Sequence, residues 1–355
     1  MEAFMKRFAD SHIHFYDYNY KGAVGCLDNL HKLGVTDSAA CSLAAYPTGG
    51  PAQNLFALYV KSKYDGPIKL RVFGSLHETD FYKDVDYEKQ LDELLSIGCE
   101  GMKFIHMKPN ARKAIGKGLN DPSYDKVLSA MEERGTPMVL HSGDPAIFWD
   151  KDRIYPSAVA RGWFYGDGSY MPYDAYYKED YELLDKHPKL NVIIAHFFFL
   201  GDNYDEAVRV METYPNVKLD LTPAWEVYVD FASKIDKWHD FFEKYSDRII
   251  FGTDSSDRRS LEGIEQTRDL VYSSLTHDNS EFSHKGVGGR MIRGLDVSQS
   301  ALDKITYGNF ARYVGEEVIP VNSEKLYYYA ERMLKDLEEN EGTKASINWL
   351  RDLLK

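Results

Sequence analysis

Two histidines in one short segment are the first residues whose spacing suggests chemistry. His12 and His14 lie in Asp10-Ser11-His12-Ile13-His14, within an apolar-polar-apolar pattern typical of a strand. Side chains two positions apart in a strand point to the same face, so both imidazoles are expected on one side. Two adjacent imidazoles supply half of the ligands of a tetrahedral metal site.

Three further strand-like runs end in residues that can also bind a metal ion. They end at His141, at His196 and at Asp254. Neutral imidazoles together with one carboxylate suit Zn²⁺, Mn²⁺ or Fe²⁺, and an ion with an open position would activate water at neutral pH. Any single one of these histidines could instead be a hydrogen-bonded core residue, but their repetition at strand ends favours a metal site.

The elements that must position these residues follow a regular rhythm. Most intervals between the strand-like runs carry a helical pattern, and two examples, 86–97 and 123–134, are followed by Gly98 and Gly135 as expected caps. Strands that alternate with helices at roughly 30-residue spacing predict a closed α/β (β/α)8 TIM barrel. The eight strand-like runs begin near residues 7, 36, 68, 99, 136, 190, 216 and 248.

Two segments interrupt this rhythm, and a third follows it. The long loop after strand five, 143–173, is rich in aromatic residues and should lie on the face of the barrel that carries active sites. Residues 276–300 have the spacing of neither strand nor helix, and we interpret them as a mobile loop. We expect residues 1–315 to form the barrel and residues 316–355 to form a carboxyl-terminal helical extension packed on it.

Composition limits the class of protein. Hydrophobic residues make up 43% of the 355 residues, and the net charge of −13 argues against a partner with a phosphate backbone. No stretch is long and apolar enough for a membrane span, and no signal sequence is evident, so we expect a cytoplasmic protein without nucleic-acid or membrane partners. Cys26, Cys41 and Cys99 are expected to be reduced core thiols. The expected partner is a small-molecule substrate, with a homo-oligomer as an option.

Several motifs together resemble the amidohydrolase superfamily. The pattern combines HxH after strand one, histidines after strands five and six, and an aspartate after strand eight. Local matches, GCEGMKFIHMKP, PMVLHSGDP, FGTDSS and ITYGNFARYV, resemble its amidohydrolase-related (amidohydrolase 2) branch, which includes carboxymuconate-semialdehyde-type decarboxylases. The resemblance covers residues 7 to about 315.

The resemblance implies roles for individual residues. Four of them, His12, His14, His141 and Asp254, would hold one metal ion, while His196 would bind a second ion or polarise the substrate. Asp254 would also take a proton from the attacking water and pass it to the leaving group.

Lys103, at the end of strand four, distinguishes between two versions of such a site. In two-metal relatives a carbamylated lysine bridges the ions; otherwise Lys103 is a cation that pairs with Asp220 or with a substrate carboxylate. We favour the second version, with one ion, zinc as the first choice and manganese or iron as alternatives.

The walls of the site depart from the family pattern at one place. Relatives commonly place glycines after the strand-six histidine, whereas here Phe197, Phe198 and Phe199 follow it. Arg161, Trp163 and Arg258 are expected to bind substrate, with Arg153 and Arg259 as further candidates for gripping a carboxylate. His106 is expected on the surface or in a loop.

Three functions fit these features. The first is a metal-dependent hydrolase that acts on a C–N or C–O bond of a small polar or carboxylated molecule. The second is a non-oxidative decarboxylase of an aromatic or unsaturated acid; some aromatic-acid decarboxylases of the branch carry a glutamate in the strand-one motif, which this chain lacks. The third is an inactive barrel that serves as a binding protein.

Overall fold

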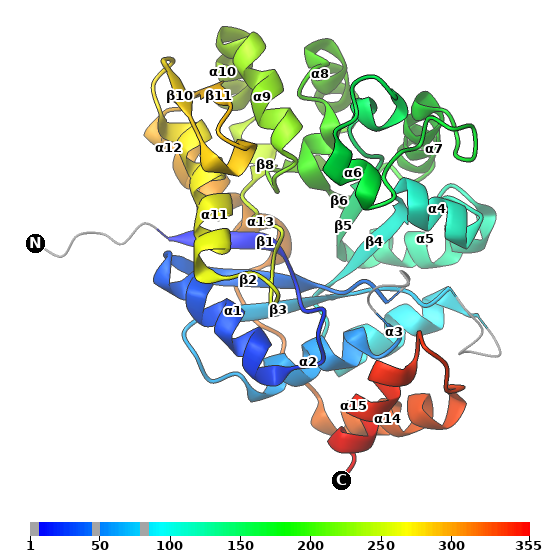
Figure 1. The fold of residues 1–355 in the computed structure, drawn as a ribbon. Helices are drawn as coiled ribbons and strands as arrows, with labels where there is room; N and C mark the ends of the chain where they lie inside the picture. Colours follow the sequence, from blue (N-terminus) through cyan, green and yellow to red (C-terminus); the bar gives the residue numbers. More distant parts are fainter. Residues whose placement is uncertain (1–6, 45–49, 79–84) are drawn as a thin grey trace, which may run out of the picture.

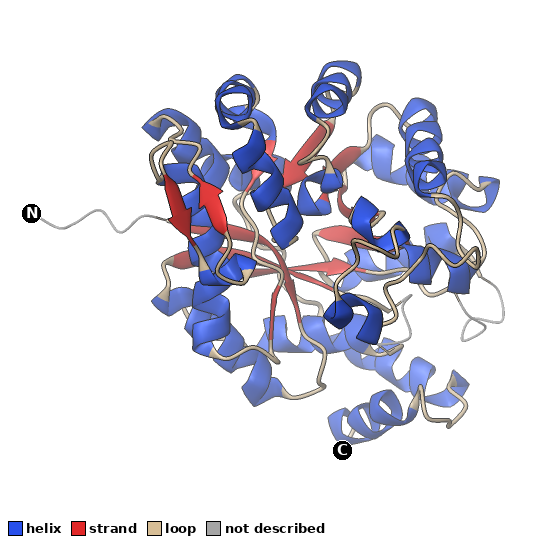
Figure 2. Cartoon of the chain, turned by 45° about the horizontal axis from the view of Figure 1, so that its top comes forward, coloured by secondary structure: helices blue, strands red, loops and turns tan. Residues whose placement is uncertain are grey.

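The computed structural model describes residues 7–44, 50–78 and 85–355. Nine parallel strands form one sheet in the order β8-β7-β6-β5-β4-β3-β2-β1-β9, surrounded by helices (Figures 1 and 2). The strands are β1 (Phe8–His14), β2 (Val35–Cys41), β3 (Lys69–Gly74), β4 (Gly101–Met107), β5 (Pro137–Ser142), β6 (Asn191–Ile194), β7 (Val217–Asp220), β8 (Ile249–Ile250) and β9 (Ser255–Ser256).

The segment that carries β8 and β9 closes the barrel. β8 pairs with β7, whereas β9, a few residues later, pairs with β1 at the opposite edge of the sheet. Between them the amide of Ser11 donates to the carbonyl of Phe251 (3.1 Å), and the amide of Asp254 donates to the carbonyl of His12 (2.9 Å). β8 and β9 are therefore two pieces of one eighth strand, and the predicted (β/α)8 barrel is confirmed.

The helices alternate with the strands as predicted. In α3 the side chain of Asp86 accepts the amide of Lys89 at the amino terminus, and Gly98 ends the helix with a φ of 132°. Gly135 ends α5 in the same left-handed region, with a φ of 65°. The helices are α1 (Tyr20–Lys32), α2 (Gln53–Lys63), α3 (Tyr87–Ile97), α4 (Pro109–Ile115), α5 (Asp125–Arg134), α6 (Pro156–Ala160), α7 (Tyr173–Lys186), α8 (Tyr204–Thr213), α9 (Trp225–Ser233), α10 (Ile235–Lys244), α11 (Leu261–Thr276), α12 (Gln299–Asp303), α13 (Asn309–Val314), α14 (Ser323–Asp336) and α15 (Lys344–Leu353).

Packed side chains fill the barrel at the end where the strands begin. Phe310 of α13 packs there with buried apolar residues that include Phe73 and Val139. The buried Arg71 guanidinium lies 5.1 Å from the centre of the Phe310 ring and pairs with Asp37 at 3.1 Å. The strand-end side chains face a cavity at the opposite rim, where this fold places its active sites.

The carboxyl-terminal residues are helical, as predicted. α14 contacts α2 and α3, and α15 lies beside α14 (Figure 1). Arg332 of α14 pairs with Glu93 of α3 at 2.7 Å, and Trp349 of α15 stacks on Tyr18. The division into a barrel of residues 1–315 and an extension of residues 316–355 stays a prediction.

Residues 276–300 differ from the expected loop without strands. β10 (Glu281–Ser283) and β11 (Met291–Arg293) form an antiparallel hairpin. Ile292, on β11, is buried, and its partner Phe282 packs against the same core. Strands of three residues are too short to show a period of two, so the sequence pattern did not reveal them.

Over the described ranges, no helix combines the length and apolarity that a membrane crossing requires.

Candidate metal centre

Three side chains at the open rim bring their donor atoms together. The Nε2 atoms of His12 and His14 lie 3.1 Å apart, and His14 Nε2 lies 3.1 Å from Oδ1 of Asp254. All three donor atoms fall within 4.8 Å of one another. Asp254 adopts a φ of 52°, in the left-handed region that aspartate and asparagine tolerate better than most residues. This conformation interrupts the eighth strand at the site.

The other nitrogen of each imidazole is held by an acceptor. His14 Nδ1 lies 2.7 Å from the carbonyl of Cys41, and His12 Nδ1 lies 3.3 Å from Oδ2 of Asp220. Burial raises the pKa of Asp220, but the hydrogen bond from His12 outweighs it and lowers the pKa to about 2. Both Nδ1 atoms must therefore donate a proton, which leaves the two Nε2 lone pairs facing each other.

This donor set fits a divalent cation. Two facing lone pairs repel each other, and a cation between them and the Asp254 carboxylate would remove that repulsion. Burial lowers the pKa of His12 to about 3, so its imidazole stays neutral, as a metal ligand requires. Burial raises the pKa of Asp254, but the neighbouring His14 and the other imidazoles outweigh it and hold that pKa well below the usual range.

Lys103 lies against this group. Its Nζ atom is 2.8 Å from His12 Nε2, and the side chain is buried, which lowers the pKa of the amine. Within the described ranges, Lys103 does not form the ion pair with Asp220 that the sequence suggested; its amine instead donates to the lone pair of His12.

His141 and His196 form a second, neighbouring pair. His196 Nε2 lies 3.2 Å from His141 Nδ1, while His196 Nδ1 lies 3.1 Å from the carbonyl of Thr222. The rings of His12 and His196 are 5.8 Å apart between their centres. The five strand-end residues therefore converge at one rim, but as a compact trio and an adjacent pair.

A buried ion pair contacts the Nε2 atom of His141. Its Nε2 lies 3.4 Å from Asp144 Oδ1, and Lys108 Nζ lies 2.7 Å from both oxygens of Asp144. The hydroxyl of Tyr165 also donates to Asp144, at 2.7 Å. The sequence analysis missed Lys108 and Asp144, although Asp144 follows His141 by only three residues.

The backbone after β6 turns in an unusual way. His196, Phe197, Phe198 and Phe199 have φ values of 56°, 55°, 54° and 51°. Glycine adopts this left-handed region without strain, whereas residues with a Cβ atom do not. Here aromatic packing holds the turn: the Phe199 ring stacks on His196 with 5.2 Å between ring centres.

A cavity of about 960 Å³ opens above the histidines and Asp254. Arg161, Trp163 and Arg258 line it, and Arg161 lies 4.9 Å from the centre of the Trp163 ring. Arg258 pairs with Asp17 at 2.5 Å, so its charge is partly compensated. Arg153 lines a neighbouring cavity of about 350 Å³ instead. Other members of the wall are Tyr16, Lys103, Lys108, Asp144, Phe148, Tyr155, Phe199, Trp225, Glu226, Arg259 and Lys285.

Two further sequence expectations concern histidine and cysteine. His106 was expected at the surface or in a loop, which is wrong: it is buried on β4, and its Nε2 lies 2.7 Å from Glu78. Its side chain follows Ile105, which faces the cavity, and so points to the other face of the sheet. The three cysteines are buried and free, as expected.

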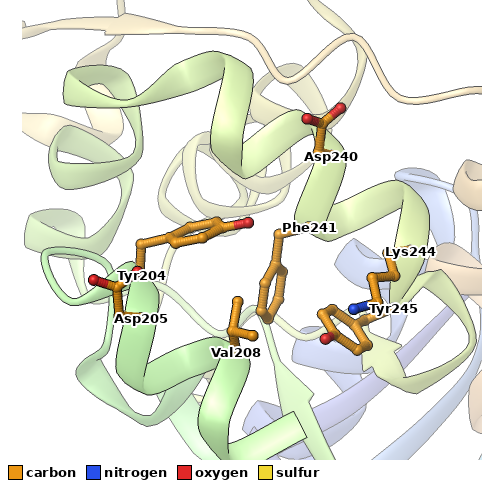
Figure 3. A pocket seen from close by; sticks show the side chains of 7 residues that line it. All are labelled: Tyr204, Asp205, Val208, Asp240, Phe241, Lys244 and Tyr245. Atoms are coloured by element: carbon orange, nitrogen blue, oxygen red, sulfur yellow. The ribbon is translucent and has the colours of Figure 1, made fainter. Parts of the chain in front are cut away.

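A second hollow lies outside the barrel, between α8 and α10 (Figure 3). It has a volume of about 220 Å³, and its lining includes Tyr204, Phe241 and Lys244 but no histidine. It therefore lacks the imidazoles that the rim cavity offers to a metal ion.

The fold and the rim define the class of this protein: a (β/α)8 barrel with clustered histidines and an aspartate at the carboxyl ends of its strands. A family model described as "Amidohydrolase" matches residues 88–315, and the chain belongs to that family. No curated protein matches the sequence significantly.

Solved structures share the fold at low sequence identity. An uncharacterized TIM-barrel protein from Bordetella bronchiseptica is 14% identical with a TM-score of 0.52, over 87% of this chain and 100% of that chain. A probable 2-pyrone-4,6-dicarboxylic acid hydrolase from Acinetobacter baumannii, with citric acid bound, is 12% identical with a TM-score of 0.51, over 87% and 99%. A dihydroxybenzoic acid decarboxylase from a Polaromonas species, with bound manganese and the inhibitor 2-nitroresorcinol, is 15% identical with a TM-score of 0.50, over 87% and 97%. These likenesses establish the fold alone.

Proposed function

We propose that this chain is a metal-dependent hydrolase that cleaves a C–N or C–O bond in a small carboxylated molecule. The observation that carries the proposal is the convergence of ligand atoms of His12, His14 and Asp254 within 4.8 Å of one another. His12, His14, His141 and Asp254 would hold one divalent ion, preferably zinc, with manganese or iron as alternatives. His196 would polarise the substrate, or hold a second ion in a two-metal version.

Asp254 is placed to move the proton. When bound, the divalent ion would supply a Lewis acid that activates water at neutral pH. The Asp254 side chain keeps 31% of its surface exposed, so its carboxylate can reach that water. Because its pKa is held well below the usual range, Asp254 is ionised at neutral pH; it would accept the proton of the water and deliver it to the departing nitrogen or oxygen.

The charges around the cavity support a carboxylated substrate. Among the ion pairs of the described residues, Arg161, Arg259 and Lys285 have no acidic partner, although all three line the cavity. An arginine can bind a carboxylate through two parallel hydrogen bonds. We propose that Arg161, stacked on Trp163, binds a carboxylate that lies away from the reacting bond, and that Arg258 borders the same region.

The aromatic side chains of the cavity wall favour a decarboxylase of an aromatic or unsaturated acid as the second candidate function. Phe148, Trp163 and Trp225 line the cavity, and flat rings of this kind suit an aromatic or unsaturated acid. In this version Asp254 would first take a proton from water and then deliver it to the carbon that loses carbon dioxide.

One screen separates the two reactions. Zinc- or manganese-loaded protein is incubated with lactones, amides and aromatic carboxylic acids, and both hydrolysis and carbon dioxide release are followed. We expect hydrolysis that disappears in His12→Ala and persists in His239→Ala, whose side chain lies outside the cavity lining. Carbon dioxide release without hydrolysis would favour the decarboxylase. A wild-type protein that binds no metal and turns over none of these compounds would leave the inactive binding barrel as the better account.

A further inference from the structure

Tyr16 continues the strand pattern that carries the two histidines. Residues 12, 14 and 16 alternate along the chain, and all three side chains line the rim cavity. The ring of Tyr16 lies 5.3 Å from the ring of His14, tilted by 30°. The phenol is therefore the next polar side chain on the cavity side of the chain after the two histidines.

Contacts from the loop after β9 hold Tyr16 in place. Its backbone amide donates to Oδ1 of Asp257 at 2.9 Å, and the amide of Asp17 donates to Oδ2 at 3.0 Å. The Arg258 guanidinium lies 4.8 Å from the centre of the Tyr16 ring. The backbone and ring of Tyr16 are thus tied to the segment that also carries Asp254.

The hydroxyl of Tyr16, by contrast, has no hydrogen-bond partner among the described residues. Phenols have an ordinary pKa near 10, so at neutral pH this hydroxyl carries a proton that it can donate. Tyr155, which also lines the cavity, has its hydroxyl engaged: it donates to Glu226 at 2.9 Å. A rigid, unused donor beside a metal centre resembles the donors that stabilise negative charge developing on a substrate oxygen.

We propose that the Tyr16 hydroxyl is a substrate-binding hydrogen-bond donor, which contacts the substrate oxygen that becomes negatively charged when water attacks. The proposal rests on the proposed function, because it requires a substrate carbonyl at the metal centre. It forms no covalent bond: the phenol keeps its proton and donates it in a hydrogen bond. Decarboxylation would use the same donor toward a carboxylate oxygen.

Acetohydroxamate and imidazole serve as probes for this donor. Both bind catalytic zinc, but acetohydroxamate presents oxygen acceptors next to the ion, whereas imidazole presents none once its nitrogen is bound. Tyr16→Phe removes only the hydroxyl and keeps the ring that packs on His14 and Arg258. Tyr20→Phe is the matched control, because the hydroxyl of Tyr20 donates to the carbonyl of Lys63, outside the cavity.

The experiment compares the full-length, zinc-loaded proteins by calorimetry. We expect Tyr16→Phe to weaken acetohydroxamate binding about tenfold, the loss typical of one hydrogen bond, with zinc content, melting temperature and imidazole affinity unchanged. Tyr20→Phe should bind both probes like the wild type.

Two results would overturn the proposal in different ways. Equal acetohydroxamate affinity in Tyr16→Phe and wild type, with zinc bound in both, would refute the role of Tyr16 and leave the metal centre standing. A wild-type protein that takes up no zinc, manganese or iron would refute the proposed function, and the role of Tyr16 with it.

Discussion

The carboxylate of Asp220, which ends β7, lies 3.3 Å from Nδ1 of His12 and orients that imidazole. Its other oxygen, Oδ1, accepts the amides of His196 (2.9 Å) and Thr222 (3.0 Å) and the Thr222 hydroxyl. The buried Asp220 side chain thus fixes both the tautomer of His12 and the turn that carries His196. Outer partners of this kind commonly control metal affinity.

Asp220→Asn tests this arrangement. Three donors face Oδ1, so the asparagine oxygen should stay there and its NH2 group should face His12 Nδ1. Nδ1 must then accept, which moves the imidazole proton to Nε2 and removes its lone pair. We expect zinc affinity to fall roughly 10–100-fold, as measured by calorimetry. The exposed Asp236→Asn is the control, and equal zinc affinity in Asp220→Asn would contradict the tautomer argument.

Asp254→Asn tests the proton-transfer role. Asparagine tolerates the φ of 52° as aspartate does, so the melting temperature should change little. Turnover of the substrate found by the screen should fall by about 10²–10⁴-fold, the usual contribution of a general acid or base. Turnover at the wild-type rate would show that another group moves the proton.

Phe197 tests the left-handed turn after β6. Replacing it loses packing against Phe231 and Phe242, at a cost of about 3–5 kcal/mol in the free energy of unfolding. At a φ of 55°, however, alanine is strained and glycine is not. Phe197→Gly should therefore be more stable than Phe197→Ala by about 1 kcal/mol in urea denaturation.

The matched control for this comparison is Phe231, which lies inside α9. Glycine is destabilising in a helix relative to alanine, so Phe231→Ala should be more stable than Phe231→Gly. The same order at both positions would contradict the left-handed conformation at Phe197.

Glu226 gives a prediction for pH. Burial raises its pKa to about 7, although the hydroxyl of Tyr155 donates to it. The folded protein therefore keeps this proton between about pH 4.5 and pH 7, where the unfolded chain has lost it, and the free energy of unfolding falls as pH rises through that window. Glu226→Gln cannot lose a proton in this range. Relative to wild type, its free energy of unfolding should therefore rise by on the order of 3 kcal/mol from pH 4 to pH 8.

The measurement is urea denaturation of wild type and variant across that pH range. Glu265→Gln, at an exposed position of α11, should run parallel to wild type throughout. A constant difference between Glu226→Gln and wild type would mean that Glu226 titrates normally.

The barrel was predictable because its signals are local and repeated. Several strands appear as apolar runs followed by a polar residue, as in the segment that leads to His141. The parallel topology then brings distant residues such as His12 and Asp254 to one rim. Gly98 and Gly135 marked helix ends because their left-handed conformations favour glycine. These features need no knowledge of side-chain packing.

The details of the site depend on packing that the sequence does not display. Lys108 and Asp144 form a buried ion pair beside His141, but charged residues of their spacing are common on surfaces. His106 was placed wrongly because its partner Glu78 comes from a distant segment. The left-handed turn after His196 also follows from tertiary packing, since phenylalanine disfavours that conformation on its own.

Metal analysis of the purified protein tests the central claim most directly. Elemental analysis should find one transition-metal ion per chain in wild type and in His239→Ala, and a strong loss in His14→Ala, whose Nε2 belongs to the compact trio. Intact mass should show an unmodified Lys103. A wild-type protein without a transition metal, or a His14→Ala variant that keeps its full content, would contradict the metal centre. Two ions with a carbamate on Lys103 would contradict the one-ion site.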